Sequence, residues 1–454
     1  MADILKQSYD LLDLKVSLET SGKTPVVFCE LEATREGTTR RLNSWHFPPS
    51  AFNLPDGITP ERSRQGTGTF RLPEGFGTQL STQLQNVTGP LWLHLVRPYG
   101  YLGLIPWERF LKDLYWLPIL RLPEFVVDPP LETPRTLDVI LWVSRPIADE
   151  AFDVMGAVQR ILRDVPKFVP RRVRFHVFTD TLFQDPLKSQ LAAEQPARGQ
   201  VVIYSAEGAP EEIPWFEWML KSLKGRSIDL VHFVGHGYFS REWPALVVAE
   251  SPLLNRAERQ ACFVGPAQLN KFLTQVGAWA FACSSPRENY SELGLRHLAD
   301  TLAQLRPGAV VFHDLGHDSG AVDLLEAFRF LFSPPPQRPG IMPNVFLYCQ
   351  PYQLGQKQVR PVSEGSAFHS VLSHATPQEV LDVFQNEENV PSWLAAAQRY
   401  MEECNWKIQQ LEGEGGESSG SGRQGEQIRG ARKALEQLQG LIAQILQQKP
   451  GGPP

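Results

Sequence analysis

Residues 228–237 have the sequence IDLVHFVGHG, an apolar run that ends in two glycines on either side of His236. Five more apolar runs of strand length occur along the chain: LWLHLV (91–96), TLDVILWVS (136–144), RVRFHVF (172–178), AWAFAC (278–283) and GAVVFH (308–313). Helix-like segments lie between several of these runs or after them: 150–164, 214–224, 292–305 and 320–332. Near-continuous apolar strands that alternate with amphipathic helices are typical of a mostly parallel sheet buried on both faces. The sequence therefore predicts an α/β fold, with functional side chains in the loops at the carboxyl ends of the strands.

The composition is that of a globular protein rather than a disordered or fibrous one. The chain has 454 residues, of which 42% are hydrophobic and 21% charged, and its formal net charge is −6. This length suggests two or three domains. No long run of Lys or Arg occurs, so we expect neither a nucleic-acid groove nor a polybasic membrane patch. The first residues lack a signal-peptide pattern, and the longest apolar stretches are shorter than the roughly 20 residues of a membrane helix. We therefore expect a cytoplasmic protein without membrane contacts.

The cysteines and the short motifs argue against several kinds of site. The five cysteines are odd in number and form no CxxC pair: Cys29, Cys262, Cys283, Cys349 and Cys404. This spacing excludes a zinc ribbon and argues against a disulfide framework. The sequence contains no GxxxxGK[ST] or HExxH motif and no GxSxG motif that follows an apolar strand, so a P-loop, a hydrolase elbow and a zinc protease helix have no support. We expect no metal and no cofactor.

The chain divides into five regions by composition and pattern. We predict a β-rich N-terminal region, an α/β domain, a Pro-rich connection with helices, a flexible Gly/Ser linker and an amphipathic C-terminal helix, at 1–88, 89–335, 336–412, 413–425 and 426–454. In the last region, apolar residues at spacings of 3 and 4 run from Ile428 to Ile445. This stripe either forms a hairpin with a helix at 393–411 or is a docking surface for a partner or a second copy.

Two of the predicted strand ends carry side chains suited to nucleophilic catalysis. His236 follows one apolar run and Cys283 ends another, where the carboxyl ends of neighbouring parallel strands would bring them together. A thiol needs an adjacent imidazole to become a good nucleophile near pH 7. The glycines beside His236 would let substrate backbone approach, and the amide of Gly237 could serve as an oxyanion donor. Taken alone, His232 and Cys283 are more often core residues, but the combination of the two motifs favours catalysis.

From about residue 90 to 332 the chain resembles the CHAT domain, a caspase-like cysteine peptidase family related to separase and gingipain. Six segments carry the resemblance: IPWE (105–108), LVHFVGHGYF (230–239), PALVV (244–248), AWAFACSS (278–285), LADTLAQLRPGAVVF (298–312) and HDSGAVDLLEAF (317–328). The resemblance implies a caspase-like sheet with helices on both faces. It also implies His236 as general acid and base, Cys283 as nucleophile, and the amides of Gly237 and Cys283 as the oxyanion hole.

The chain departs from the family near the expected substrate pocket. Ser285 and Pro286 stand where a glycine usually follows the nucleophile, and Asp314 lies near the position of a usual Trp. In relatives that cut after basic residues, an acidic side chain in this later loop binds the P1 side chain. The resemblance therefore places Asp318, or as second candidate Asp314, in the S1 pocket. The alternative for either residue is an exposed loop carboxylate or a helix cap.

These observations favour a cysteine endopeptidase that cleaves a protein substrate, after a basic residue. The family is similar to effectors of bacterial defence or cell-death systems, so we expect a regulatory protein partner that binds the N-terminal region or the C-terminal helices. The alternative from another class is a catalytically silent caspase-like scaffold for protein–protein interaction. A third alternative is a non-proteolytic thiol enzyme, which the missing glycine after Cys283 favours.

Overall fold

The computed structural model describes most of the chain up to residue 355. The described residues are 10–19, 25–35, 38–54, 70–85, 89–113, 117–124, 136–144, 146, 153–180, 184–189, 199–206, 215–240, 243–253, 261–286 and 289–355. The predicted linker, the C-terminal helix and most of the predicted Pro-rich connection therefore lie outside the described residues. Within the described parts of the chain, no helix is both long and apolar enough to cross a membrane.

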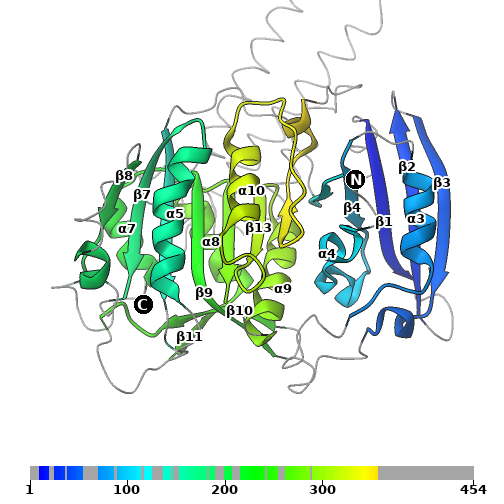
Figure 1. The fold of residues 1–454 in the computed structure, drawn as a ribbon. Helices are drawn as coiled ribbons and strands as arrows, with labels where there is room; N and C mark the ends of the chain where they lie inside the picture. Colours follow the sequence, from blue (N-terminus) through cyan, green and yellow to red (C-terminus); the bar gives the residue numbers. More distant parts are fainter. Residues whose placement is uncertain are drawn as a thin grey trace, which may run out of the picture.

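One large, mostly parallel mixed sheet forms the centre of the molecule (Figure 1). Its strands, in spatial order, are β3 (Thr38–Phe47), β2 (Val26–Arg35), β1 (Leu11–Glu19), β4 (Leu91–Leu95), β5 (Ile119–Arg121), β14 (Val345–Tyr348), β13 (Ala309–Asp314), β12 (Ala280–Ser285), β9 (Leu230–Ser240), β6 (Thr136–Ser144), β7 (Arg172–Thr179) and β8 (Gly199–Ile203). β9 also pairs with β10 (Trp243–Ala249), which pairs with β11 (Ala261–Val264) in an antiparallel extension. The α/β fold that the sequence predicts is confirmed at this level.

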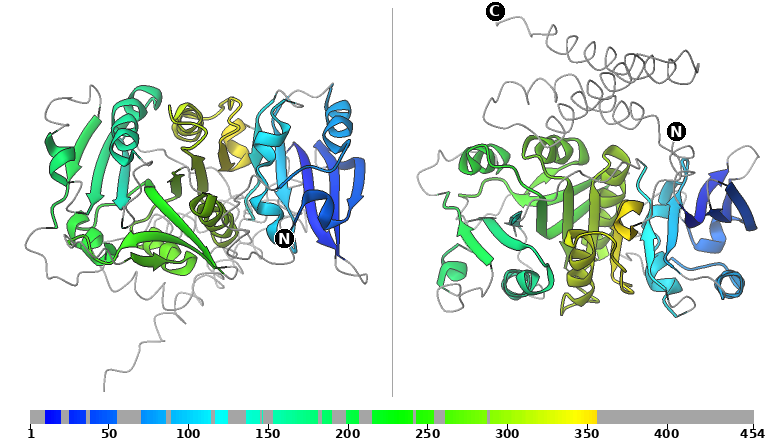
Figure 2. Two further views of the ribbon diagram at one scale, coloured as in Figure 1. Left: turned by 60° about the horizontal axis from the view of Figure 1, so that its bottom comes forward. Right: turned by 90° about the horizontal axis from the view of Figure 1, so that it is seen from above.

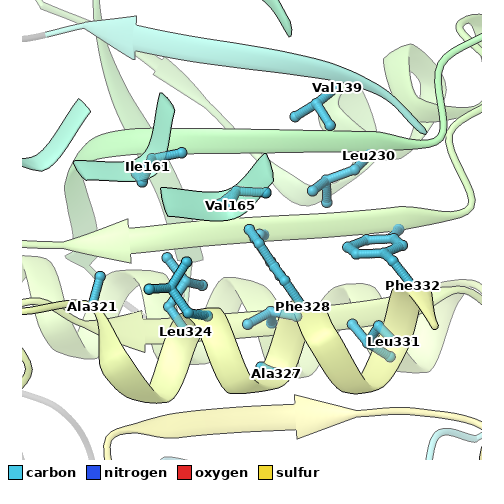
Figure 3. Close-up of a cluster of buried hydrophobic side chains, with 14 of the residues drawn as sticks. Val139, Ile161, Val165, Leu230, Ala321, Leu324, Ala327, Phe328, Leu331 and Phe332 are labelled. Atoms are coloured by element: carbon cyan, nitrogen blue, oxygen red, sulfur yellow. The ribbon is translucent and has the colours of Figure 1, made fainter. Parts of the chain in front are cut away.

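Helices cover both faces of the sheet. On one face lie α5 (Val154–Phe168) and α10 (Val322–Phe332), and on the other α7 (Trp215–Leu223), α8 (Pro266–Gln275) and α9 (Asn289–Leu305). Figure 3 shows residues of α5 and α10 packed together with strand residues Val139 and Leu230. We call these two sides the α10 face and the α9 face. Four of these helices coincide with the segments that the sequence predicts; α8 is an addition.

The burial of successive strand residues explains why the runs are apolar throughout. In β6, Val139 and Leu141 belong to the core on the α10 face, while Ile140 and Trp142 belong to the core on the α9 face. Neighbouring residues of a strand point to opposite faces, so a strand covered on both sides needs apolar residues at every position.

The N-terminal strands join the same sheet as the α/β domain. β1 to β5, together with the helices α3 (Phe76–Leu84) and α4 (Trp107–Leu111), surround a core of their own, which we call the N-terminal lobe. β14 follows the predicted domain end at residue 335, yet it lies between β5 of this lobe and β13 (Figure 2). The domain therefore continues to at least β14, and the two predicted regions 1–88 and 89–335 share one sheet. β5 and β14 have 3 and 4 residues, too few for a periodic pattern.

The central strands have the order of a doubly wound sheet. Along β7-β6-β9-β12-β13 the strands are all parallel, and their chain order is second, first, third, fourth and fifth. In sheets of this order, ligands bind outside the carboxyl ends of the strands, where the strand order reverses. Here that point lies between β6 and β9, next to the strand that carries His236.

Candidate active site

The carboxyl ends of β9, β12 and β13 lie side by side, as the sequence predicts. In the register of the sheet, Cys283 lies beside Phe233 of β9 and beside Phe312 of β13. Cys283 is the fourth residue of β12, and the strand continues through Ser284 and Ser285. The predicted nucleophile therefore lies inside the sheet, two residues before the end of its strand.

Cys283 is fully buried on the α9 face. Its Sγ lies 4.0 Å from the carbonyl oxygen of Leu295 in α9, and its neighbours across the sheet are two phenylalanine rings. Burial raises the pKa of the Cys283 thiol, so the sulfur is protonated at neutral pH. In this conformation Cys283 has the environment of a core cysteine, because none of the described residues provides a charge that would compensate a thiolate there.

His236 lies on the strand next to Cys283 but on the other face of the sheet. The adjacent Gly237 faces α9: a Cβ added to Gly237 would lie 2.6 Å from the carbonyl oxygen of Ser291. Since neighbouring residues of a strand alternate in direction, His236 points toward the α10 face. The structure thus places the predicted pair on adjacent strands, and strand alternation directs the two side chains to opposite faces.

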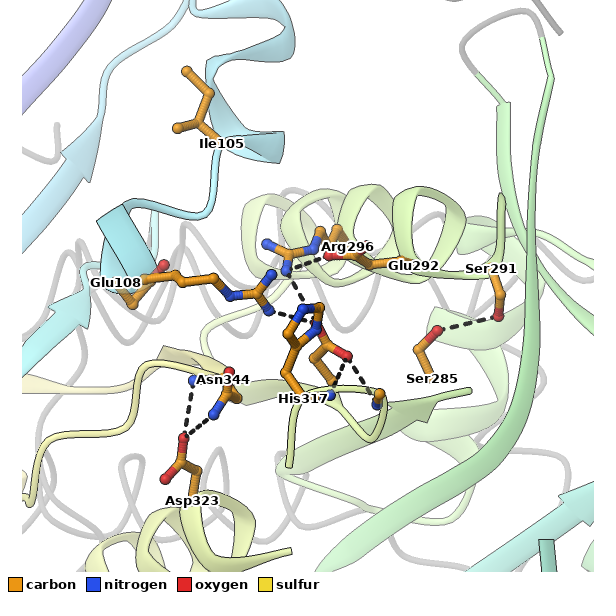
Figure 4. A network of polar contacts seen from close by, with 12 residues as sticks. Ile105, Glu108, Ser285, Ser291, Glu292, Arg296, His317, Asp323 and Asn344 are labelled. Atoms are coloured by element: carbon orange, nitrogen blue, oxygen red, sulfur yellow. Dashed lines mark hydrogen bonds and ion pairs between the residues drawn. The ribbon is translucent and has the colours of Figure 1, made fainter. Parts of the chain in front are cut away.

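Both predicted oxyanion donors belong to internal structure. The amide of Gly237 donates to Oγ of Ser291 at 2.8 Å, and Ser291 Oγ lies 3.2 Å from Oγ of Ser285 (Figure 4). The amide of Cys283 lies within β12, between its two partner strands. The missing side chain at Gly237 lets α9 approach the strand at the place where we expected a substrate backbone.

A chain of buried polar side chains crosses the α10 face of the same strands. His232 Nε2 lies 2.8 Å from Oγ of Ser284, which lies 3.0 Å from Nδ1 of His313. His313 Nε2 lies 3.2 Å from a carboxylate oxygen of Asp318. With a neutral His313 ring, Nε2 donates to Asp318, Ser284 donates to Nδ1 of His313, and His232 donates to Ser284. We call these four residues the buried relay.

The surroundings shift the pKa values of two relay residues, His232 and Asp318. Burial lowers the pKa of His232 to about 3, with a further contribution from the nearby His313, so His232 is neutral at physiological pH. Burial by itself raises the pKa of Asp318, but its hydrogen bond with His313 and the amides of Val322 and Asp323 lower it overall. The sequence favours a core position for His232. For Ser284, His313 and Asp318, the available sequence signal is that they are polar residues at the ends of apolar runs or in the loop that follows.

Asp318 caps helix α10. Its two carboxylate oxygens accept hydrogen bonds from the backbone amides of Val322 at 2.9 Å and Asp323 at 2.8 Å. The side chain is almost buried, with 8% of the residue exposed. The helix-cap alternative therefore describes the position of Asp318, and its role in S1 stays a prediction.

Asp314, the second S1 candidate, lies on the α9 face at the end of β13. One carboxylate oxygen accepts from the amides of Gly316 and His317, and the other lies 2.5 Å from Nη2 of Arg109. The second oxygen also lies 2.9 Å from Nδ1 of His317 and 3.8 Å from Nη2 of Arg296. Figure 4 shows this network, which sequence analysis misses because Arg109 is 205 positions away in the chain.

These charges keep Asp314 ionised. Burial alone raises the pKa of the Asp314 carboxyl, but Arg296, Arg109 and His317 lower it overall. Arg296 is itself buried against the rings of Phe312 and Phe346, 4.8 Å and 4.1 Å from the ring centres. A guanidinium stacked on aromatic faces is stabilised by the ring electrons.

Two surface cavities lie away from these strand ends, and no metal-ligand cluster occurs among the described residues. Two surface cavities of about 380 and 530 Å³ are lined by residues of α3 and its preceding loop with Phe110, and by residues around the end of α7. Among the described residues, no three His, Cys, Asp or Glu side chains are grouped as a metal ion would require. No family model, curated protein or solved structure matches the chain.

Proposed function

We propose that the chain is a caspase-like cysteine endopeptidase of the CHAT type and that the conformation described above is its latent state. The observation that supports this most directly is the position of His236 and Cys283 on the neighbouring parallel strands β9 and β12, beside the point where the strand order reverses. The protein substrate, the basic P1 residue, the cytoplasmic location and the place in a defence or cell-death system rest on the family resemblance alone.

The latent state explains how a protease could be held inactive by packing. For catalysis, the thiol of Cys283 must leave the apolar layer and transfer its proton to His236. The sulfur then adds to the scissile carbonyl carbon, His236 returns the proton to the leaving amine, and water hydrolyses the thioester. The end of β12 must therefore change its orientation to expose Cys283. A separate partner or sensor that moves this strand would then control activity.

Thiol labelling tests both the latent state and its activation. Cys262 is exposed, whereas Cys283 is buried, so a small alkylating reagent should modify Cys262 at least tenfold faster in the isolated protein. When the chain is co-expressed with its genomic neighbours and its trigger, Cys283 should become the faster site and a protein should be cleaved. Cleavage should disappear in Cys283→Ala and His236→Ala and persist in Cys262→Ala. Persistence of cleavage in either of the first two variants would refute the assignment.

The second candidate function is a catalytically silent scaffold with the same fold. The burial of Cys283 against Leu295 favours it, because this is the environment of a structural cysteine. Under this alternative, Cys283 stays the slower thiol with every partner that binds the chain, and Cys283→Ser leaves the biological effect intact.

A further inference from the structure

The contact between Arg109 and Asp314 joins the N-terminal lobe to the predicted substrate edge. Arg109 belongs to α4, a helix of 5 residues, and its Nη2 lies 2.5 Å from a carboxylate oxygen of Asp314 at the end of β13. The Asp314 side chain is 4% exposed and the Arg109 side chain 20% exposed. The carboxylate is thus covered, while its basic partner reaches it from the side of the solvent.

Asp314 has the properties of a cation-binding group. The amides of Gly316 and His317 fix one of its oxygens, which leaves the other oxygen directed at Arg109, His317 and Arg296. The nearby positive charges lower the pKa of the carboxyl, so the site keeps its negative charge. A carboxylate that is oriented in advance by backbone amides binds a guanidinium with little loss of entropy.

Arg109 occupies this position without using its whole hydrogen-bonding capacity. Its Nε is buried and has no hydrogen-bond partner among the described residues. By contrast, the neighbouring Glu108 holds Arg121 with two contacts, of 2.6 Å and 3.1 Å, and Arg121 is fully buried. Helix α4 is therefore anchored through Glu108, and Arg109 can leave its site without loss of that anchor.

We propose that Asp314 forms the floor of a guanidinium-binding subsite, that Arg109 is its internal occupant, and that a basic side chain of the substrate displaces Arg109. The displacement of Arg109 by a substrate rests on the proposed function, whereas the binding of a guanidinium group does not. Arg109 then keeps the subsite closed until a stronger basic ligand, or a movement of α4, opens it.

Removal of the arginine side chain tests the subsite. In the full chain, Arg109→Ala leaves a space shaped for a guanidinium group, and methylguanidinium should fill it. We expect the Tm of this variant to rise by about 2 °C at about five times the Kd of methylguanidinium. Methylammonium at the same concentration controls for ionic strength and should give no such rise. Arg109→Ser, which also vacates the space but keeps a polar group there, provides a second variant should Arg109→Ala aggregate.

Two matched controls locate the effect at Asp314. The rise should disappear in the double variant Arg109→Ala/Asp314→Asn, and it should be absent in the wild type, where Arg109 fills the site. It should also be absent in Arg163→Ala, which removes an arginine from the exposed side of α5. An equal response to methylammonium, or no response in both Arg109 variants, overturns the proposal.

Peptide cleavage separates this proposal from the proposed function. In activated protein, Arg109→Ala should lower KM several-fold for substrates with P1 Arg and leave neutral P1 substrates unchanged. Methylguanidinium binding without cleavage of any substrate would support the subsite and refute the peptidase. Cleavage after neutral residues, without methylguanidinium binding, would support the peptidase and refute the subsite.

Discussion

At the residue scale, Ser284 shows how one hydroxyl can satisfy two buried rings. Its Oγ lies between His232 and His313, and all three residues are fully buried. A buried imidazole nitrogen without a partner costs about 1–3 kcal/mol. The hydroxyl therefore contributes to stability although it neighbours the predicted nucleophile.

Ser284→Ala should lower the free energy of unfolding by about 1–3 kcal/mol, since it leaves two buried ring nitrogens without this partner. Urea unfolding measures the change. Thr82→Ala is the matched control: its hydroxyl donates to the carbonyl of Thr78 on the exposed side of helix α3, so its removal should cost less than about 0.5 kcal/mol. Equal losses in the two variants would show that the relay adds nothing beyond an ordinary exposed hydrogen bond.

At the element scale, the first turn of α10 depends on a carboxylate that precedes it. The carboxylate of Asp318 accepts hydrogen bonds from two backbone amides of this turn. It also lies 3.2 Å from Nε2 of His313, and this contact links the helix to β13. Negative charge near a helix N-terminus is stabilised by the helix dipole. The position of α10 relative to the carboxyl edge of the sheet therefore depends on the ionisation of one side chain.

Asp318→Asn should cost about 1 kcal/mol of unfolding free energy at pH 7. The pKa of Asp318 is lowered in the folded state, so this contribution is complete above its unfolded pKa of about 4 and disappears as the pH falls toward the folded value. The difference between wild type and variant should thus be constant from about pH 5 to 8 and shrink below about pH 4, as measured by urea unfolding at each pH. A difference that does not depend on pH would contradict the cap.

At the scale of the whole molecule, a buried polar cluster joins the two halves of the sheet. Arg121 of β5 pairs with Glu108, donates to the carbonyls of Gly103 and Ile105, and lies beside Tyr348 of β14. Tyr348 in turn donates to Asp300 of α9. The N-terminal lobe is therefore connected to the α/β part through buried charged and polar side chains.

Glu108→Gln should destabilise the whole chain by about 3–5 kcal/mol, because it leaves the buried Arg121 without its counter-charge. The exposed pair of Arg163 and Asp164 gives the comparison: Asp164→Asn should change stability by less than about 1 kcal/mol. Far-UV circular dichroism and tryptophan fluorescence should show a single coincident transition in the wild type. A small effect of Glu108→Gln, similar to that of the surface pair, would show that the lobe is only loosely attached.

The sequence by itself determined the elements whose pattern is local. The strands near 136–144, 228–235 and 278–283 could be predicted because both of their faces are buried, which makes every position apolar. The segment before α10 could be identified as a helix cap or a binding loop. Within the site, His236 and Cys283 could be assigned to strands that prove to be neighbours.

Only the tertiary structure decided which side chains meet. Alternation along β9 and β12 directs His236 and Cys283 to opposite faces, and this depends on a register that no local pattern encodes. The pairing of Arg109 with Asp314 joins positions 205 residues apart, and the insertion of β14 beside β5 involves strands of 4 and 3 residues. Local sequence sets the preferences of each element, whereas long-range contacts depend on how the packed layers fit together.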